Sequence, residues 1–251
     1  MSGHSKWANI KHQKERADAQ KGQLYTRLSR EIIVAAKQGG PNPETNFRLR
    51  LAIQRARQAN MPVDNIERAI KRAVGEGETS NYEELTYEGY GPGGVAVMVD
   101  VLTDNRNRTA AEIRHLFSKY GGSLGESGCV AWMFERKGIL FLAKESATID
   151  EDSLTLAALE AGAEDLSVDE EGYTITTDPA AFEQVKEKLE EQGFSFDEAE
   201  LTMVPTSTVP VSGQEAEKVL RLVDALEDQD DVQHVYANFE VSDTTMEALR
   251  S

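Results

Sequence analysis

Apolar residues recur every three or four positions through the first part of the chain, and arginine or lysine occupies the positions between them. Three such stripes stand out, at residues 24–35, 49–56 and 63–74. This spacing is typical of amphipathic helices. Breaks are expected at Gly22, at residues 39–43 and at residues 60–62, since glycine ends helices and proline opens them. The pattern predicts a small helical bundle over residues 1–76, followed by a polar linker at 75–81.

Beyond residue 82 the hydrophobic period shortens to two, which predicts strands. The expected elements are a strand, a glycine-rich turn, a β-branched buried strand, a helix and a further strand, at residues 85–87, 89–94, 95–101, 108–120 and 130–134. The turn at 89–94 needs glycine because positive φ angles are expected there.

The next stretch repeats a strand-helix-strand order. Its expected elements are strands at 139–143, 165–168, 173–176 and 198–204 with helices at 153–161 and 180–192, joined by a hairpin turn at 170–172. Two βαβ halves in series make a ferredoxin-like (βαββαβ) unit. A last strand, helix and strand at 208–211, 215–227 and 232–239 form another half, followed by a loose tail at 244–251.

These patterns predict a multidomain fold of α and β elements, with a helical N-terminal bundle and two ferredoxin-like α+β domains, the second inserted in the first. The expected domains are 1–76, then 82–136 joined with 206–241, and the inserted 137–205.

Charge is segregated along the chain. Residues 1–76 hold 15 Lys and Arg against seven Asp and Glu, a net charge of +8. Residues 77–251 hold 12 against 37, a net charge of −25, so the whole chain carries −17. Because local charge selects partners, the two regions are expected to serve different ones, with a polyanion for the first.

Several function classes are disfavoured by the sequence. A single cysteine, Cys129, permits no intrachain disulfide and is expected to be a small buried residue. No run approaches the roughly 18 apolar residues of a membrane span, and no secretory leader is evident, which favours a cytoplasmic protein without a membrane partner. The four histidines are scattered, and the glycine cluster at 89–94 precedes a strand rather than a helix. We therefore expect no metal site, no cofactor, no catalytic residue and no enzymatic activity.

The N-terminal segment is the strongest site candidate because cations alternate there with an aromatic ring and amide side chains. Such a mixture suits phosphate neutralisation and base stacking. The predicted nucleic-acid-binding residues are His4, Lys6, Trp7, Asn9, Lys11, Lys14, Arg16 and Lys21. The alternative is a solvated helix face with Trp7 packed on the bundle.

Two further groups of arginines extend the predicted site. Arg48 and Arg55 share one helix face and Arg50 and Arg57 another, so at least one pair faces solvent or a ligand. Arg106 and Arg108 lie before a helix N-terminus, where anions bind readily. The alternative at this corner is a plain N-cap formed by Asn107 or Thr109.

Six motifs resemble those of the YebC family, which includes the mitochondrial translational activator of cytochrome c oxidase. They are GHSKWANIKH at 3–12, NFRL at 46–49 with Ala52 beyond it, MPVDNI at 61–66, YEGYGPGG at 87–94, TDNRNRT at 103–109 and GGSLG at 121–125. The resemblance runs nearly end to end. It implies a helical N-domain with two ferredoxin-like domains, and either DNA binding by a probable transcriptional regulator or ribosome association that helps translate proline-rich stretches.

Three hypotheses follow. The first is a ribosome-associated factor that holds ribosomal RNA, with basic ribosomal proteins as a further partner of the acidic region. The second is a DNA-binding transcriptional regulator. The third, a small-molecule sensor, rests only on analogy with other paired ferredoxin-like domains.

Replacing Lys6, Lys11 and Lys14 together with alanine tests the N-terminal part of the site. Binding of nucleic acid is expected to weaken, and its salt dependence to flatten, because fewer counterions are released. Titrations at several salt concentrations measure this, with circular dichroism to show retained folding. An unchanged salt slope would mean that these lysines do not contact phosphates.

Overall fold

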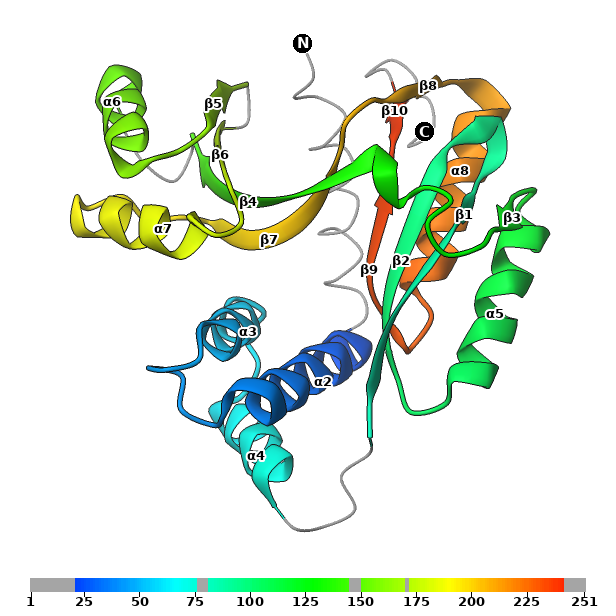
Figure 1. Cartoon of the computed structure of the whole chain (residues 1–251), viewed down its shortest axis with the longest axis horizontal. Helices are drawn as coiled ribbons and strands as arrows, with labels where there is room; N and C mark the ends of the chain where they lie inside the picture. The colour runs from blue at the N-terminus through cyan, green and yellow to red at the C-terminus, as the bar shows by residue number, and fades with distance from the viewer. Residues whose placement is uncertain (1–20, 76–80, 145–149, 170–171, 242–251) are drawn as a thin grey trace. The chain divides into compact units, whose positions relative to one another are not determined.

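The computed structural model describes residues 21–75, 81–144, 150–169 and 172–241, and combines helices with β-sheets (Figure 1). By internal contacts the chain forms two compact units. The inserted unit is Phe134–Thr206, and the main unit contains the described residues before and after it. The predicted mixture of α and β elements is therefore confirmed. None of the described helices is both long and apolar enough to cross a bilayer.

The main unit begins with a three-helix bundle: α2 (Lys21–Gly39), α3 (Phe47–Gln58) and α4 (Val63–Val74). Its core includes the fully buried Ile32 and Leu49. The buried Asn46 caps α3 by accepting from the Leu49 N–H at 3.1 Å, while its amide donates to the Ala35 carbonyl at 2.8 Å. One side chain thus joins the start of α3 to the end of α2.

Gly22 is the second residue of α2, and the chain before Lys21 lies outside the described residues, so the break expected at Gly22 stays a prediction. The breaks expected at 39–43 and 60–62 are confirmed, and Asn60 there has a positive φ of 58°.

The second part of the main unit is a four-stranded antiparallel sheet. Its strands are β1 (Glu83–Tyr90), β2 (Ala96–Thr103), β3 (Ser123–Leu124) and β9 (Val232–Ala237), in the order β3-β1-β2-β9. Helices α5 (Arg106–Lys119) and α8 (Gly213–Glu227) supply Phe117 and Leu222 to one core with Val97 and Val99 of β2. β2 is buried along nearly its whole length, and its alternate residues Val97, Val99 and Val101 point to the face that the helices cover.

The sequence predicts that the strand at 208–211 joins the sheet of residues 82–136, and this prediction is wrong. This segment, β8 (Val209–Val211), pairs in parallel with β10 (Phe239–Val241) in a separate two-stranded sheet, and β1 occupies the position beside β2. A tight turn with positive φ at Gly93 and Gly94 joins β1 to β2. Pairing of these two strands therefore closes only a short loop, which costs less chain entropy than a long one. β8 has only three residues, and its central Pro210 lacks an N–H.

The prediction of a strand at 130–134 is also wrong. A short 3-10 helix, Ala131–Met133, occupies this stretch. The carboxylate of the buried Glu88 accepts hydrogen bonds from the backbone N–H groups of Gly128, Val130 and Ala131. These donors therefore have a side-chain partner in place of a neighbouring strand.

The inserted unit follows the predicted βαββαβ order. Its elements are β4 (Phe134–Ala143), α6 (Glu151–Ala161), β5 (Asp165–Val168), β6 (Gly172–Thr177), α7 (Phe182–Glu191) and β7 (Glu198–Pro205). The strands form an antiparallel sheet in the order β5-β6-β4-β7, over a core that includes Leu140, Leu154 and Phe182. Assignment of the domains to the ferredoxin-like class stays a prediction.

A buried carboxylate, Asp231, joins the bundle to the sheet within the main unit. Its side chain is 2% exposed. It accepts from Nη1 of Arg30 on α2 at 2.8 Å, and from Nη2 of Arg108 at 3.0 Å and the Thr109 hydroxyl at 2.7 Å on α5. The Thr103 hydroxyl at the end of β2 lies 3.4 Å away. Four donors from three elements converge on one carboxylate.

Arg30 contributes more than this ion pair. Its guanidinium also donates to the carbonyls of Leu102, at 3.2 Å, and Asp230, at 2.8 Å. It lies 5.3 Å from the centre of the Tyr82 ring. We call Asp231 with Arg30, Arg108 and Thr109 the Asp231 cluster.

Burial alone would raise the pKa of Asp231, but hydrogen bonds from Thr109, Arg108 and Arg30 outweigh it and hold the pKa below the ordinary value. A carboxyl whose pKa is lowered by folding stabilises the fold at pH values above its unfolded pKa, which is about 3.9. That contribution is lost as the pH falls toward the lower pKa of the folded state.

Asp231→Asn is expected to lower the free energy of unfolding by about 3 kcal/mol at neutral pH, because Arg30 and Arg108 lose a buried anionic partner. The difference from the wild type should shrink as the pH falls from about 3.9, the unfolded pKa, toward the lower folded-state pKa of Asp231, where its carboxylate becomes protonated. Urea unfolding at several pH values measures this. Asp230→Asn, a change of the same type at an exposed neighbour, should cost less than about 0.5 kcal/mol. Equal unfolding midpoints for both variants would contradict a stabilising role for the cluster.

Candidate nucleic-acid interface

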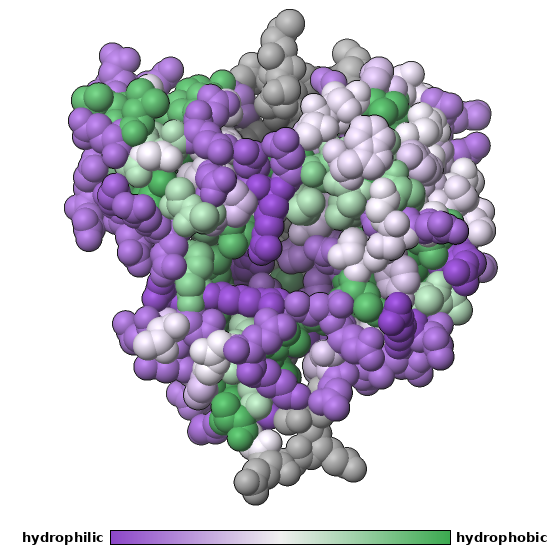
Figure 2. Space-filling view, in the orientation of Figure 1, coloured by the Kyte–Doolittle hydropathy of each residue, from purple (hydrophilic) through white to green (hydrophobic). Residues whose placement is uncertain are grey.

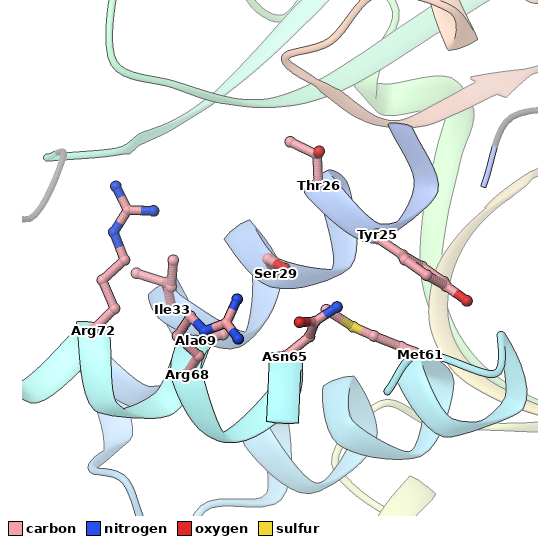
Figure 3. A pocket seen from close by; sticks show the side chains of 9 residues that line it. All are labelled: Tyr25, Thr26, Ser29, Ile33, Met61, Asn65, Arg68, Ala69 and Arg72. Atoms are coloured by element: carbon pink, nitrogen blue, oxygen red, sulfur yellow. The ribbon is translucent and has the colours of Figure 1, made fainter. Parts of the chain in front are cut away.

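A groove lies between α2 and α4 of the bundle, with a volume of about 280 Å³ (Figure 3). The nine lining residues come from these two helices and the turn before α4: Tyr25, Thr26, Ser29, Ile33, Met61, Asn65, Arg68, Ala69 and Arg72. On each helix the lining positions recur three and four residues apart, so each helix turns one face to the groove.

The groove has an apolar floor and polar walls. Ile33, Met61 and Ala69 are buried and form part of the bundle core. Tyr25 is held in place because its hydroxyl donates to the Asn60 carbonyl at 2.8 Å. The walls offer an amide, two hydroxyls and two guanidinium groups, a donor-rich set that suits phosphate and sugar oxygens.

The two arginines of the groove are exposed on α4. Within the described residues, no carboxylate forms an ion pair with Arg68 or Arg72. Residues 21–75 hold 11 Lys and Arg against four Asp and Glu, a net charge of +7. Within the described part of the chain, the groove is therefore a cationic surface whose two guanidinium groups have no carboxylate partner.

Most of the predicted N-terminal site lies outside the described residues. This group comprises His4, Lys6, Trp7, Asn9, Lys11, Lys14 and Arg16. Lys21 begins α2, and its side chain is not among those described. The role assigned to these residues stays a prediction.

The arginines of α3 differ in their surroundings. Arg48 pairs with Glu84 and contacts Gln38, and Arg55 pairs with Glu31 at 3.2 Å.

Arg50 donates to the Pro43 carbonyl at 3.3 Å and lies 5.3 Å from the centre of the Phe47 ring. Arg57 is exposed and forms no ion pair with the described part of the chain. Of the four, only Arg57 retains a charge unmatched by the protein's own groups in that part.

At the α5 corner, Arg106 is exposed, whereas Arg108 pairs with Asp104 at 3.1 Å and Asp231 at 3.0 Å. The N-cap is Asn105, whose side chain accepts from the Arg108 N–H. The alternative that placed the N-cap at Asn107 or Thr109 is therefore wrong, because the helix begins earlier in the chain. Thr109 binds Asp231 instead. The chain's own carboxylate occupies part of the corner expected for an anion.

None of the predicted site residues whose side chains are described lines the groove. Ser29 and Asn65 are not predicted as site residues from the sequence, whereas Arg68 and Arg72, with Lys71, continue the basic row that begins at Arg48 but are not among the predicted site residues. The available signal was the spacing of Asn65, Arg68 and Arg72 at i, i+3 and i+7 on a helix with apolar residues between them. The pairing of α4 with α2 was needed to turn that face into a groove.

In the described ranges, the remaining cysteine, tryptophan and possible metal ligands do not come together in one site. The thiol of Cys129 is half-buried, and burial, followed by the nearby Glu88, raises its pKa and disfavours the reactive thiolate. Trp132 is 72% exposed, and its ring nitrogen donates to the Cys129 carbonyl at 3.1 Å. Among the described residues, no group of three or more His, Cys, Asp or Glu is placed to hold a metal ion.

Comparison with known proteins connects this architecture to one family. Residues 5–76 match the TACO1/YebC protein N-terminal domain, and residues 82–239 match the TACO1/YebC second and third domain. A probable transcriptional regulatory protein of Dictyoglomus thermophilum is 61% identical over 249 residues, covering 99% of this chain and all of that protein. One of the same description from Persephonella marina is 56% identical over 251 residues, covering 99% of this chain and all of that protein.

A crystal structure of a conserved hypothetical protein from Aquifex aeolicus superposes with a TM-score of 0.81 at 52% identity, covering 90% of this chain and 93% of that one. Because family matches extend over both the bundle and the α/β part, and relatives above 50% identity span nearly the whole chain, the chain belongs to the TACO1/YebC family.

Proposed function

We propose that this protein is a non-enzymatic regulator of gene expression that binds nucleic acid through its helical bundle. The observation that carries the proposal is the α2–α4 groove, where Arg68 and Arg72 have no carboxylate partner within the described residues. Exposed guanidinium groups beside hydroxyl and amide groups suit a phosphodiester backbone, which is bound by charge and by hydrogen bonds to its oxygens. The printed names of the relatives, probable transcriptional regulatory proteins, support the same class of function.

The polymer that we propose is ribosomal RNA, with the protein acting as a cytoplasmic ribosome-associated factor that aids the synthesis of proline-rich stretches. The resemblance of the sequence motifs to the YebC family is the basis for this choice. Residues 77–251 carry a net charge of −25, which repels RNA and so confines contact to the bundle. Any effect on peptide-bond formation would come from positioning of the reacting groups on the ribosome and not from a catalytic side chain of this protein.

A DNA-binding transcriptional regulator is the second candidate, favoured by the relatives' names. A regulator of this kind should prefer its own duplex over random DNA by a factor of roughly 10³ or more. Sequence-specific recognition requires contacts to base edges, which arginine and asparagine side chains such as Arg68, Arg72 and Asn65 can make as well as contacts to phosphate.

The groove is tested by Arg68→Ala combined with Arg72→Ala in the full chain. RNA binding should weaken, and the slope of log affinity against log salt should decrease in magnitude by about 2, because two phosphate contacts are lost. Fluorescence anisotropy at several salt concentrations measures the slope. The matched control is Lys218→Ala combined with Arg221→Ala, which removes two exposed cations from α8. If both variants change the slope equally, the groove has no special role in binding.

Ribosome association is tested by sedimentation of a translating lysate at moderate salt. The wild-type protein is expected in the ribosomal fractions, and the Arg68/Arg72 variant is expected to shift toward free protein because its electrostatic contacts are weaker. Crosslinking in cells, followed by sequencing of both RNA and DNA, identifies the polymer. Migration of the wild type only as free protein, with crosslinks confined to a preferred DNA sequence, would replace the ribosomal proposal with the transcriptional one.

A further inference from the structure

Helix α6 of the inserted unit carries apolar residues on two opposite faces. Leu154, Ala157, Ala158 and Ala161 are buried and pack into the unit. Leu156 and Leu159, on the other side of the helix, are 60% and 65% exposed. Two exposed leucines opposite a side that is already packed give the second face the character of a contact surface.

The neighbourhood of this face is apolar in the centre and acidic at the edge. In Figure 2, green apolar atoms gather over α6 and are bordered by purple hydrophilic ones. Asp152 and Glu160 are exposed and lie one turn before and one turn after Leu156, on the same stripe of the helix. Val168 on the adjacent β5 is also exposed, at 37%. We call Leu156, Leu159, Asp152 and Glu160 the α6 face.

The charge of the inserted unit limits what can cover this face. Residues 134–206 contain five Lys and Arg against 19 Asp and Glu, a net charge of −14. A nucleic acid or an anionic membrane surface would be repelled, and so would the α6 face of a second copy. A cationic surface with apolar side chains in its centre meets both requirements.

We infer that the α6 face binds a cationic amphipathic helix of another protein. Leu156 and Leu159 would contact the apolar stripe of that helix, while Asp152 and Glu160 would face lysines or arginines along its edges. This is helix-on-helix recognition with complementary charge at the rim. The inference uses residues in the inserted unit only, so it stands apart from the proposed nucleic-acid function of the bundle.

The test uses the full chain and a fluorescent peptide of about 18 residues, long enough to form a helix, made of leucine on one face and lysine and alanine elsewhere. A matched peptide carries glutamate in place of lysine. Anisotropy at about 0.15 M salt, where long-range attraction is screened, measures binding. The lysine peptide is expected to bind saturably at one site and the glutamate peptide is not.

Two variants separate the contributions of the face. Leu156→Ser with Leu159→Ser should weaken binding of the lysine peptide at least about tenfold, as loss of two central apolar contacts does at an interface. Asp152→Asn with Glu160→Gln keeps the leucines, and should weaken binding and reduce its salt dependence. Because all four side chains are exposed, thermal unfolding is expected to change little. The charge variant still tests the face if the leucine variant folds poorly.

The matched control is Val63→Ser with Val74→Ser, which removes two comparably exposed apolar side chains, 59% and 55%, from the cationic helix α4. It should leave peptide binding unchanged. The inference is overturned if the lysine peptide binds the leucine variant as tightly as the wild type, or if both peptides bind alike. It is equally overturned if the leucine variant loses RNA binding or self-association instead, since the face would then serve a different partner.

Discussion

The arrangement of the main unit depends on one buried carboxylate. Asp231 precedes β9 and receives donors from α2 and α5, so it fixes a helix of the bundle and a helix of the sheet layer to the same point. Without these donors, a carboxylate that is 2% exposed would be strongly disfavoured. The depressed pKa of Asp231 expresses this balance, because the hydrogen bonds outweigh the cost of burial. The cluster therefore fixes where α2 lies against the sheet layer of the main unit.

Arginines that are equivalent in the sequence differ in their tertiary partners. Arg30 and Arg108 are as basic in sequence as Arg68, yet both are committed to Asp231, which lies 201 and 123 residues away along the chain. Arg48 and Arg55 are likewise engaged by Glu84 and Glu31. Sequence spacing identifies which cations share a helix face, but only tertiary structure decides which of them already have an anion. Arg68 and Arg72 differ because α4 turns them to a groove rather than to a carboxylate of the described chain.

The helices and most strands were predictable because their signals are local. Periodicity located α3, α4 and α5 to within two residues at each end, and the glycine-rich turn before β2 has the expected positive φ angles. Errors arose where a partner distant in sequence took over backbone hydrogen bonds. The Glu88 carboxylate accepts from the N–H groups of Gly128, Val130 and Ala131, so the apolar run there does not form a strand. Asn238 accepts the Ala96 N–H at 2.7 Å, at the point where the last predicted strand divides into β9 and β10.

Segregated charge accounts for how one chain with a net charge of −17 can present a cationic surface. At physiological ionic strength, interactions between exposed charges fade beyond about 8 Å, so a ligand senses the charges near its own site rather than the total. The bundle carries +7 over residues 21–75, and the inserted unit carries −14 over residues 134–206. The proposed binding of a polyanion at the groove and of a cationic helix at the α6 face are compatible for this reason. Each surface also excludes the other's ligand, so that two partners of opposite charge would be held by one chain without competing.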